Sequence, residues 1–162
     1  GHCQRFAQET QSGTARTLHG PTGERNVYTL APRARVLCLA QSVDDLLTQT
    51  AAVLATGGTA LWPNAQASLR AQLPTLVQAK VMLQDNTLND GTLELDAVLH
   101  HGDAPSLQAV CTALARRAGP IVGATALQPG AVDIPLERLL IERALSVNTA
   151  AAGGNASLMT IG

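Results

Sequence analysis

Two adjacent histidines are the residues of this chain that could most readily do chemistry. His100 and His101 end a short apolar run, and Cys111 lies further along, so the three could suggest a metal site. Zinc needs three or four ligands that converge at fixed distances, whereas neighbouring residues of a strand point to opposite faces. We therefore expect one histidine to face the core and the other to face solvent, with no metal site.

The cysteines Cys3, Cys38 and Cys111 are odd in number and far apart. A thiol nucleophile needs surroundings that lower its pKa, and Cys38 and Cys111 both lie within apolar runs. We expect both to be buried structural thiols. Reduced, unpaired cysteines favour a cytoplasmic protein.

Two glycine-containing segments could hold a phosphate. Glycine-rich turns cradle phosphates where a strand leads into a helix, but no strand precedes Gly153-Gly154 and no helix clearly follows. Gly102-Asp103 could be the remnant of a pyrophosphate turn, although Asp103 would repel the phosphates and is better suited to capping a helix. No catalytic, cofactor-binding or metal-binding residue is expected in this chain.

The composition excludes several classes of protein. The 162 residues are 46% hydrophobic and 14% charged, which is typical of one folded domain with a core. A net charge of −1 and only three aromatic residues argue against a nucleic-acid surface. No apolar run reaches the roughly 18 residues of a membrane-spanning helix, and no direct membrane contact is expected.

Short apolar runs alternate with amphipathic helical patterns from residue 35 onward. Strands are predicted at 36–40, 59–62, 80–84, 97–100 and 121–125. Ser42, Asn64 and Asp103 are suited to begin the helices between them, and Gly57-Gly58 is suited to end the first. This order predicts an α/β fold, a Rossmann-like and mostly parallel sheet with helices on both faces.

The regions outside this core are less regular. Residues 3–13 have a weak helical pattern, and 14–30 alternate about the turn 20–23, which predicts a β-hairpin before the Rossmann-like part. The spacing of apolar residues predicts an amphipathic helix over 135–147. We divide the chain into a tag remnant and leading segment (1–13), a hairpin flap (14–30), a degenerate Rossmann-like domain (31–147) and a docking tail (148–162).

The tail is small and polar, then ends in bulky apolar residues. Such residues at a chain end need another surface to cover them, so we expect the tail to be an interface. Its predicted interface residues are Asn148, Thr149, Ala152, Gly153, Gly154, Asn155, Leu158, Met159 and Ile161.

Three segments resemble the cofactor-binding half of aldehyde dehydrogenases: Ala55–Pro63, Asp96–Gly102 and Gly119–Gly130. The resemblance places Trp62 where that family has the lysine that contacts the cofactor ribose, and Ser106 where it has a turn glycine. The catalytic glutamate would fall within residues 125–127, which contain no acid, and the half that carries the catalytic cysteine is absent. The resemblance therefore implies a scaffold without the chemistry.

The segment Asn148–Ser157 after such a domain resembles the C-terminal end of long proline utilization A (PutA) proteins. The resemblance implies a parent polypeptide that oxidises proline to glutamate, with an FAD-dependent proline dehydrogenase and an NAD-dependent glutamate-semialdehyde (pyrroline-5-carboxylate) dehydrogenase. FAD and NAD would belong to the parent, with no cofactor in this part. Some such parents carry an N-terminal DNA-binding repressor domain, and peripheral association with the inner membrane is also implied.

The resemblance further implies a role for this part of the parent. It would pack on the catalytic aldehyde dehydrogenase domain of the same polypeptide and help to seal the cavity through which the intermediate is channelled. Two alternatives stay open: an NAD-binding domain with residual affinity for the cofactor, or a homodimerisation module that uses the edge of the hairpin.

Overall fold

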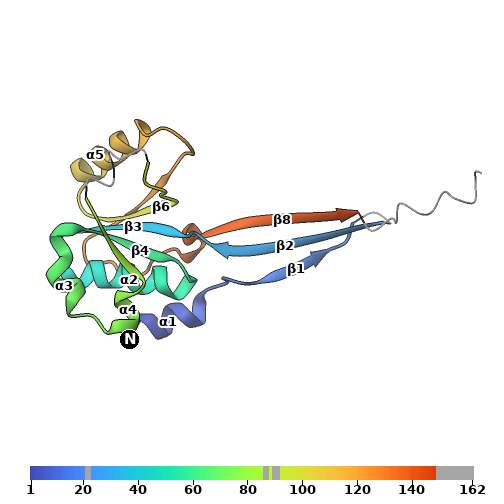
Figure 1. Cartoon of the computed structure of the whole chain (residues 1–162), viewed down its shortest axis with the longest axis horizontal. Helices are drawn as coiled ribbons and strands as arrows, with labels where there is room; N and C mark the ends of the chain where they lie inside the picture. Colours follow the sequence, from blue (N-terminus) through green and yellow to red (C-terminus); the bar gives the residue numbers. More distant parts are fainter. Residues whose placement is uncertain (21–22, 86–87, 89–91, 149–162) are drawn as a thin grey trace, which may run out of the picture.

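The computed structural model describes residues 1–20, 23–85, 88 and 92–148, and it contains two sheets. One is a five-stranded sheet within a globular body, and the other is a three-stranded antiparallel sheet that projects from that body as an arm (Figure 1). The predicted α/β fold is confirmed.

The five-stranded sheet is parallel throughout, in the order β5-β4-β3-β6-β7. The first strand in the sequence, β3, lies in the middle of the sheet. The next two, β4 and β5, extend the sheet to one edge, and β6 and β7 then extend it to the other edge. This is the order of a doubly wound Rossmann sheet. The strands are β3 (Arg35–Ala40), β4 (Thr59–Pro63), β5 (Val81–Gln84), β6 (Ala97–His101) and β7 (Gly123–Leu127).

Helices cover both faces of this sheet, as predicted. On one face, α2 (Val43–Thr56) covers a cluster that contains Trp62 and the inward residues of β3. On the other face, α5 (Ala104–Ala115) places Val110 and Leu114 against Leu37 of β3. Alternate residues of β3 therefore enter different cores, which explains why its sequence is a continuous apolar run.

Local signals set the ends of α2. The Ser42 hydroxyl accepts a hydrogen bond from the Asp45 amide at 3.1 Å, and Gly57 ends the helix with φ of 96°. Both agree with the sequence expectation for this helix. The remaining helices are short: α1 (His2–Glu9), α3 (Ala67–Ala71), α4 (Thr75–Gln78) and the 3-10 turns η1 (Asn64–Gln66) and η2 (Leu136–Leu139). Among the described residues, no helix is long and apolar enough to span a bilayer.

The projecting sheet has the order β1-β2-β8. Strands β1 (Ala15–Leu18) and β2 (Glu24–Pro32) form the predicted hairpin, and β8 (Leu140–Asn148) pairs antiparallel with β2 along its whole length. We call this three-stranded sheet the flap.

The helix predicted over 135–147 is wrong. Only 136–139 form a 3-10 turn, and the rest is strand β8. An isolated helix of this length is marginal, whereas β2 offers a nine-residue edge from Glu24↔Asn148 to Pro32↔Leu140. This pairing joins residues over a hundred positions apart, so local spacing could not reveal it.

The cysteine prediction holds for one residue and fails for the other. Cys38 is fully buried, and burial raises the pKa of its thiol. Cys111 is exposed, because only Val110 and Leu114 of α5 are buried against the sheet and Cys111 lies outside that contact.

Phe6 is the buried residue of helix α1 and is 1% exposed in the cluster beneath α2, while Arg5 of the same helix pairs with Asp133 at 2.8 Å. We expect Phe6→Ala to lower the free energy of unfolding by about 3–5 kcal/mol, the usual cost of removing a buried phenyl group. Urea unfolding measures this. Gln8→Ala on the exposed side of the same helix is the control, with an expected change of roughly 0.5 kcal/mol or less. Equal effects of the two changes would contradict the packing described here.

Candidate functional site

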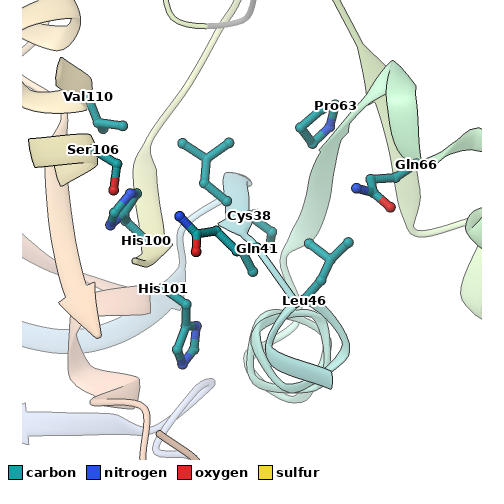
Figure 2. Close-up of a pocket in the computed structure, with 11 residues that line it drawn as sticks. Cys38, Gln41, Leu46, Pro63, Gln66, His100, His101, Ser106 and Val110 are labelled. Atoms are coloured by element: carbon teal, nitrogen blue, oxygen red, sulfur yellow. The ribbon is translucent and has the colours of Figure 1, made fainter. Parts of the chain in front are cut away.

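The order in which the strands are added to the sheet reverses between β3 and β6, although all five strands are parallel. These strands pair through Leu39↔His100 and Ala40↔His101, and the helices that follow them cover opposite faces. Ligands of doubly wound folds bind outside the carboxyl ends of the strands at such a switch point. This chain has a pocket there, the switch-point pocket (Figure 2), lined by Cys38, Leu39, Ala40, Gln41, Leu46, Pro63, Gln66, His100, His101, Ser106 and Val110.

The switch-point pocket is too small for a dinucleotide. Its volume is about 180 Å³, whereas pockets for ordinary organic ligands measure roughly 300–1,000 Å³. Any ligand enclosed here would have to be much smaller than NAD.

The N-terminus of α5, where a phosphate would be expected, already holds a carboxylate. Asp103 caps the helix as predicted, accepting a hydrogen bond from the Ser106 amide at 2.9 Å. Hydrogen bonds from Ser106 lower the pKa of Asp103, so it is ionised at neutral pH and occupies the favourable position for a negative charge. Since no described residue lining the pocket is Lys or Arg, an anionic ligand finds no compensating charge.

The two histidines do not divide between core and solvent as expected. His100 is 5% exposed and His101 is 1% exposed. The loop after β7 covers His101, whose Nε2 lies 2.9 Å from the Ala131 carbonyl oxygen, and His100 lines the pocket beside α5. Alternation along β6 was a correct premise, but His100 is buried beside the pocket and the loop after β7 covers His101, so neither histidine faces solvent.

A buried hydrogen-bond network holds the His101 ring in place. The Gln49 amide nitrogen donates both to the Leu39 carbonyl at 2.9 Å and to His101 Nδ1 at 2.8 Å. His101 Nδ1 therefore accepts from Gln49, and His101 Nε2 is placed to donate to the Ala131 carbonyl oxygen. The network connects α2, β3, β6 and the loop that leads to η2.

Asp45 adds a second connection to that loop. Its Oδ1 accepts a hydrogen bond from the Gly130 amide at 3.0 Å and lies 3.9 Å from His101 Nε2. Through these hydrogen bonds, Gln49, His101 and Asp45 join α2 and the central strands to the loop after β7. Among the described residues, no group of three His, Cys, Asp or Glu could hold a metal ion.

Two residues that the sequence resemblance matched to aldehyde dehydrogenase positions, Trp62 and Ser106, form packing and helix-capping contacts in this structure. Trp62 is fully buried, and its indole Nε1 donates to Thr50 Oγ1 at 2.9 Å. Ser106 Oγ donates to the Asp103 carbonyl at 3.0 Å within the first turn of α5. Residues 125–127 lie in β7, at one edge of the sheet.

The flap is a second candidate site, of a different kind. Every residue of β8 after Leu140 is exposed. Because strand residues alternate, Ile141, Leu145 and Val147 share one face, which also carries Arg143. Val27 of β2 lies opposite Leu145 on that face. The outer edge of β8 pairs with no described strand, so the flap presents both an apolar face and a free edge.

Sequence reasoning missed this surface because it assigned β8 to a helix. The alternation of Leu145 and Val147 with Ser146 and Asn148 was a signal, although a short one, that could have found it. Of the predicted tail interface, only Asn148 is described, as the last residue of β8. Residues 149–161 lie outside the described part of the chain, and their interface role stays a prediction.

Curated proteins similar to this chain are bifunctional PutA proteins. That of Salmonella typhimurium is 54% identical over 163 residues, covering 99% of this chain and 12% of the relative. That of Escherichia coli is 51% identical over 162 residues, with the same coverage, and that of Rhizobium meliloti is 40% identical over 153 residues. The chain thus spans about 12% of the length of these relatives. No protein-family model matches it.

Solved structures share the fold at lower identity. A Bradyrhizobium japonicum PutA mutant superposes with a TM-score of 0.58 at 20% identity, covering 78% of this chain and 15% of that one. The aldehyde dehydrogenase KauB of Pseudomonas aeruginosa gives a TM-score of 0.50 at 13% identity, covering 70% of this chain and 26% of that one. Both likenesses establish the fold alone.

The Gln49 amide is the central donor of the buried network. We expect Gln49→Leu to lower the free energy of unfolding by about 1–3 kcal/mol, because it leaves the Leu39 carbonyl and His101 Nδ1 without their donor. Denaturant unfolding measures this loss, and nitrogen-15 NMR of the imidazole reports the tautomer of His101. The matched control is Gln108→Leu on the exposed side of α5. A loss no greater than that of the control would contradict the network.

Burial lowers the pKa of His100 from its ordinary value of 6.5, and the charge of Asp103 opposes this effect only in part. Below pH 6.5 the unfolded chain therefore binds more protons than the folded chain, so stability falls as the pH is lowered. We expect His100→Phe to make the decline between pH 6.5 and 5 shallower in urea unfolding. His19→Asn, at an exposed position, should leave the slope unchanged, and an unchanged slope in His100→Phe would contradict the prediction.

Proposed function

This chain is homologous over 99% of its length to a segment of the bifunctional PutA proteins, and we propose that it is a non-catalytic domain of such a protein. In this proposal it lies at the C-terminal end of the parent and packs as a lid and scaffold on the catalytic aldehyde dehydrogenase domain of the same polypeptide. The parent oxidises proline to glutamate with FAD and NAD as cofactors.

The state of the switch-point pocket supports the absence of cofactor chemistry. The pocket is too small for NAD, Asp103 occupies the helix N-terminus, and Trp62 is packed into the core rather than facing a ribose. Residual NAD binding, the alternative, would need a site elsewhere. Calorimetric titration of the chain with NAD tests it, since micromolar binding would overturn the non-catalytic proposal.

The docking role is supported by the apolar residues of β8 and by its outer edge, which no strand within the described residues covers. An unpaired strand edge is a template for another strand, and Ile141, Leu145 and Val147 are 41%, 61% and 42% exposed beside it. A monomeric domain normally avoids such a combination. In the parent, the edge and face would be covered by the catalytic domain, and the tail that follows Asn148 would continue the same contact.

A lid of this kind has a physical benefit for a two-step oxidation. Enclosing the product of the first step keeps it from diffusing away and raises its effective concentration at the second active site. The flap surface also suits a second copy of the chain, which is the dimerisation alternative. Light scattering on the 162-residue chain distinguishes docking on the catalytic domain from dimerisation, because a stable dimer would show that two copies of this chain associate.

In the full-length parent, we expect Leu145→Asp to cut coupled proline-to-glutamate turnover at least several-fold, because a charge on the apolar face opposes docking. Proline dehydrogenase activity measured alone should not change, and the intermediate should appear in bulk solution. Deleting 148–162 should have the same effect.

The control is Ser146→Asp, which adds the same charge to the exposed, opposite face of β8. Unchanged coupled flux in both Leu145→Asp and the deletion would rule out the docking role. Equal losses in Leu145→Asp and Ser146→Asp would show that the effect is general destabilisation.

A further inference from the structure

The flap separates its charges by face. Residues that pair directly across antiparallel strands lie on the same face of a sheet, so the strand registers assign each flap residue to one face or the other. We call the face that carries Ile141, Leu145 and Val147 the docking face. Arg25 and Arg143 lie on this face, whereas Glu24 and Glu142, the two acids of the flap strands, lie on the opposite face.

Only the docking face carries charges of a single sign. On the opposite face, Arg16 lies beside Tyr28, and a side-chain hydrogen bond to Glu142 is the largest cause of the raised pKa of Tyr28. That face therefore mixes a cation with acids. Arg25 and Arg143 are both exposed, and neither forms an ion pair with any described residue. The uncompensated positive charge of the flap thus lies on its docking face.

The two arginines flank an apolar pair. Val27↔Leu145 lies between Arg25 and Arg143 on the docking face. Arg25 lies opposite Val147, four residues beyond Arg143, so the two arginines stand about 13 Å apart along the strands at a rise of about 3.4 Å per residue. A guanidinium group binds a carboxylate through two parallel hydrogen bonds. The matching surface therefore has an apolar centre with a carboxylate on each side.

The single sign of charge disfavours a second copy of the chain as the occupant. Two copies that pack docking face to docking face about a two-fold axis present the same residues to each other, so arginine would meet arginine across the contact. The chain also spans only about 12% of the length of the similar PutA proteins. In a parent of that length, an acidic surface on the same polypeptide is present at high effective concentration.

We propose that the docking face binds an acidic surface of the catalytic aldehyde dehydrogenase domain in the same parent polypeptide. Arg25 and Arg143 each pair with a carboxylate of that surface, while Val27 and Leu145 pack on the apolar patch between the carboxylates. This inference rests on the docking role proposed above and adds to it the charge that the partner must carry.

The test compares substitutions on the two faces of the flap in the full-length parent. We expect Arg143→Glu to lower coupled proline-to-glutamate turnover several-fold and to release the intermediate into bulk solution. Arg143→Lys should retain most of the turnover because it keeps the charge. Arg16→Glu is the matched control, since it makes the same change at an exposed position of the opposite face. Equal losses in Arg143→Glu and Arg16→Glu would overturn the proposal.

Salt provides an independent readout. Raising the ionic strength from about 0.05 M to about 0.5 M screens exposed charges, so more of the intermediate should escape from the unchanged parent. The double variant Arg25→Gln/Arg143→Gln should lose more intermediate at low salt and respond less to added salt. A salt response as steep as that of the unchanged parent would contradict the proposed ion pairs.

The outcomes separate this inference from the docking role. If Leu145→Asp lowers turnover and Arg143→Glu does not, docking stands and the acidic partner is wrong. The arginines would then serve only to prevent aggregation of an exposed sheet, for which a charge of either sign suffices. If neither variant lowers turnover, the docking role fails and this inference fails with it.

An anionic membrane is the other surface that a cationic, apolar face could meet. Flotation with phosphatidylglycerol vesicles tests this, and we expect the unchanged parent and the double variant Arg25→Glu/Arg143→Glu to behave alike. Flotation that is lost in the double variant would show that the docking face binds lipid, and it would overturn the proposal.

Discussion

The pairing of β3 with β6 is the interaction on which the rest of this structure depends. Five consecutive pairs, from Val36↔Ala97 to Ala40↔His101, join the two central strands, and side chains on both faces of the pair are buried. Both faces of the pair are covered by helices: α2, which follows β3, packs on one face, and α5, which follows β6, packs on the other. The two cores, the switch point and its pocket follow from that arrangement.

Polar residues at the ends of these strands have partners within the protein. Gln49 joins Leu39 to His101, His101 reaches the loop after β7, and Asp103 closes the start of α5. Within the described part of the chain, Gln49 Nε2, His101 and Asp103 thus bond to other groups of the protein, whereas Gln49 Oε1 and His100 Nδ1 are buried without a hydrogen-bond partner. A doubly wound scaffold can in this way keep its stability while its binding crevice contracts.

The flap differs from the body in that, after Leu140, the apolar side chains of β8 are exposed. Its strands are mutually paired, yet β1 and β8 each have an edge that no described strand covers, and the apolar residues of β8 contribute to neither core cluster. Apolar side chains on an exposed edge strand favour association with another polypeptide. The body thus explains how the domain is stable, and the flap explains why the domain is suited to contact a partner.

By itself, the sequence determined the elements whose signals are local. The apolar run of β3, the Ser42 and Asp103 caps, the Gly57 stop and the hairpin were all predicted, because a buried strand, a helix end and a tight turn each depend on neighbouring residues. Only the tertiary structure decided the burial of both histidines, the exposure of Cys111 and the conversion of 140–148 into a strand. Those outcomes depend on which distant segment lies alongside, and pairing β2 with β8 yields more backbone hydrogen bonds than a short isolated helix could retain.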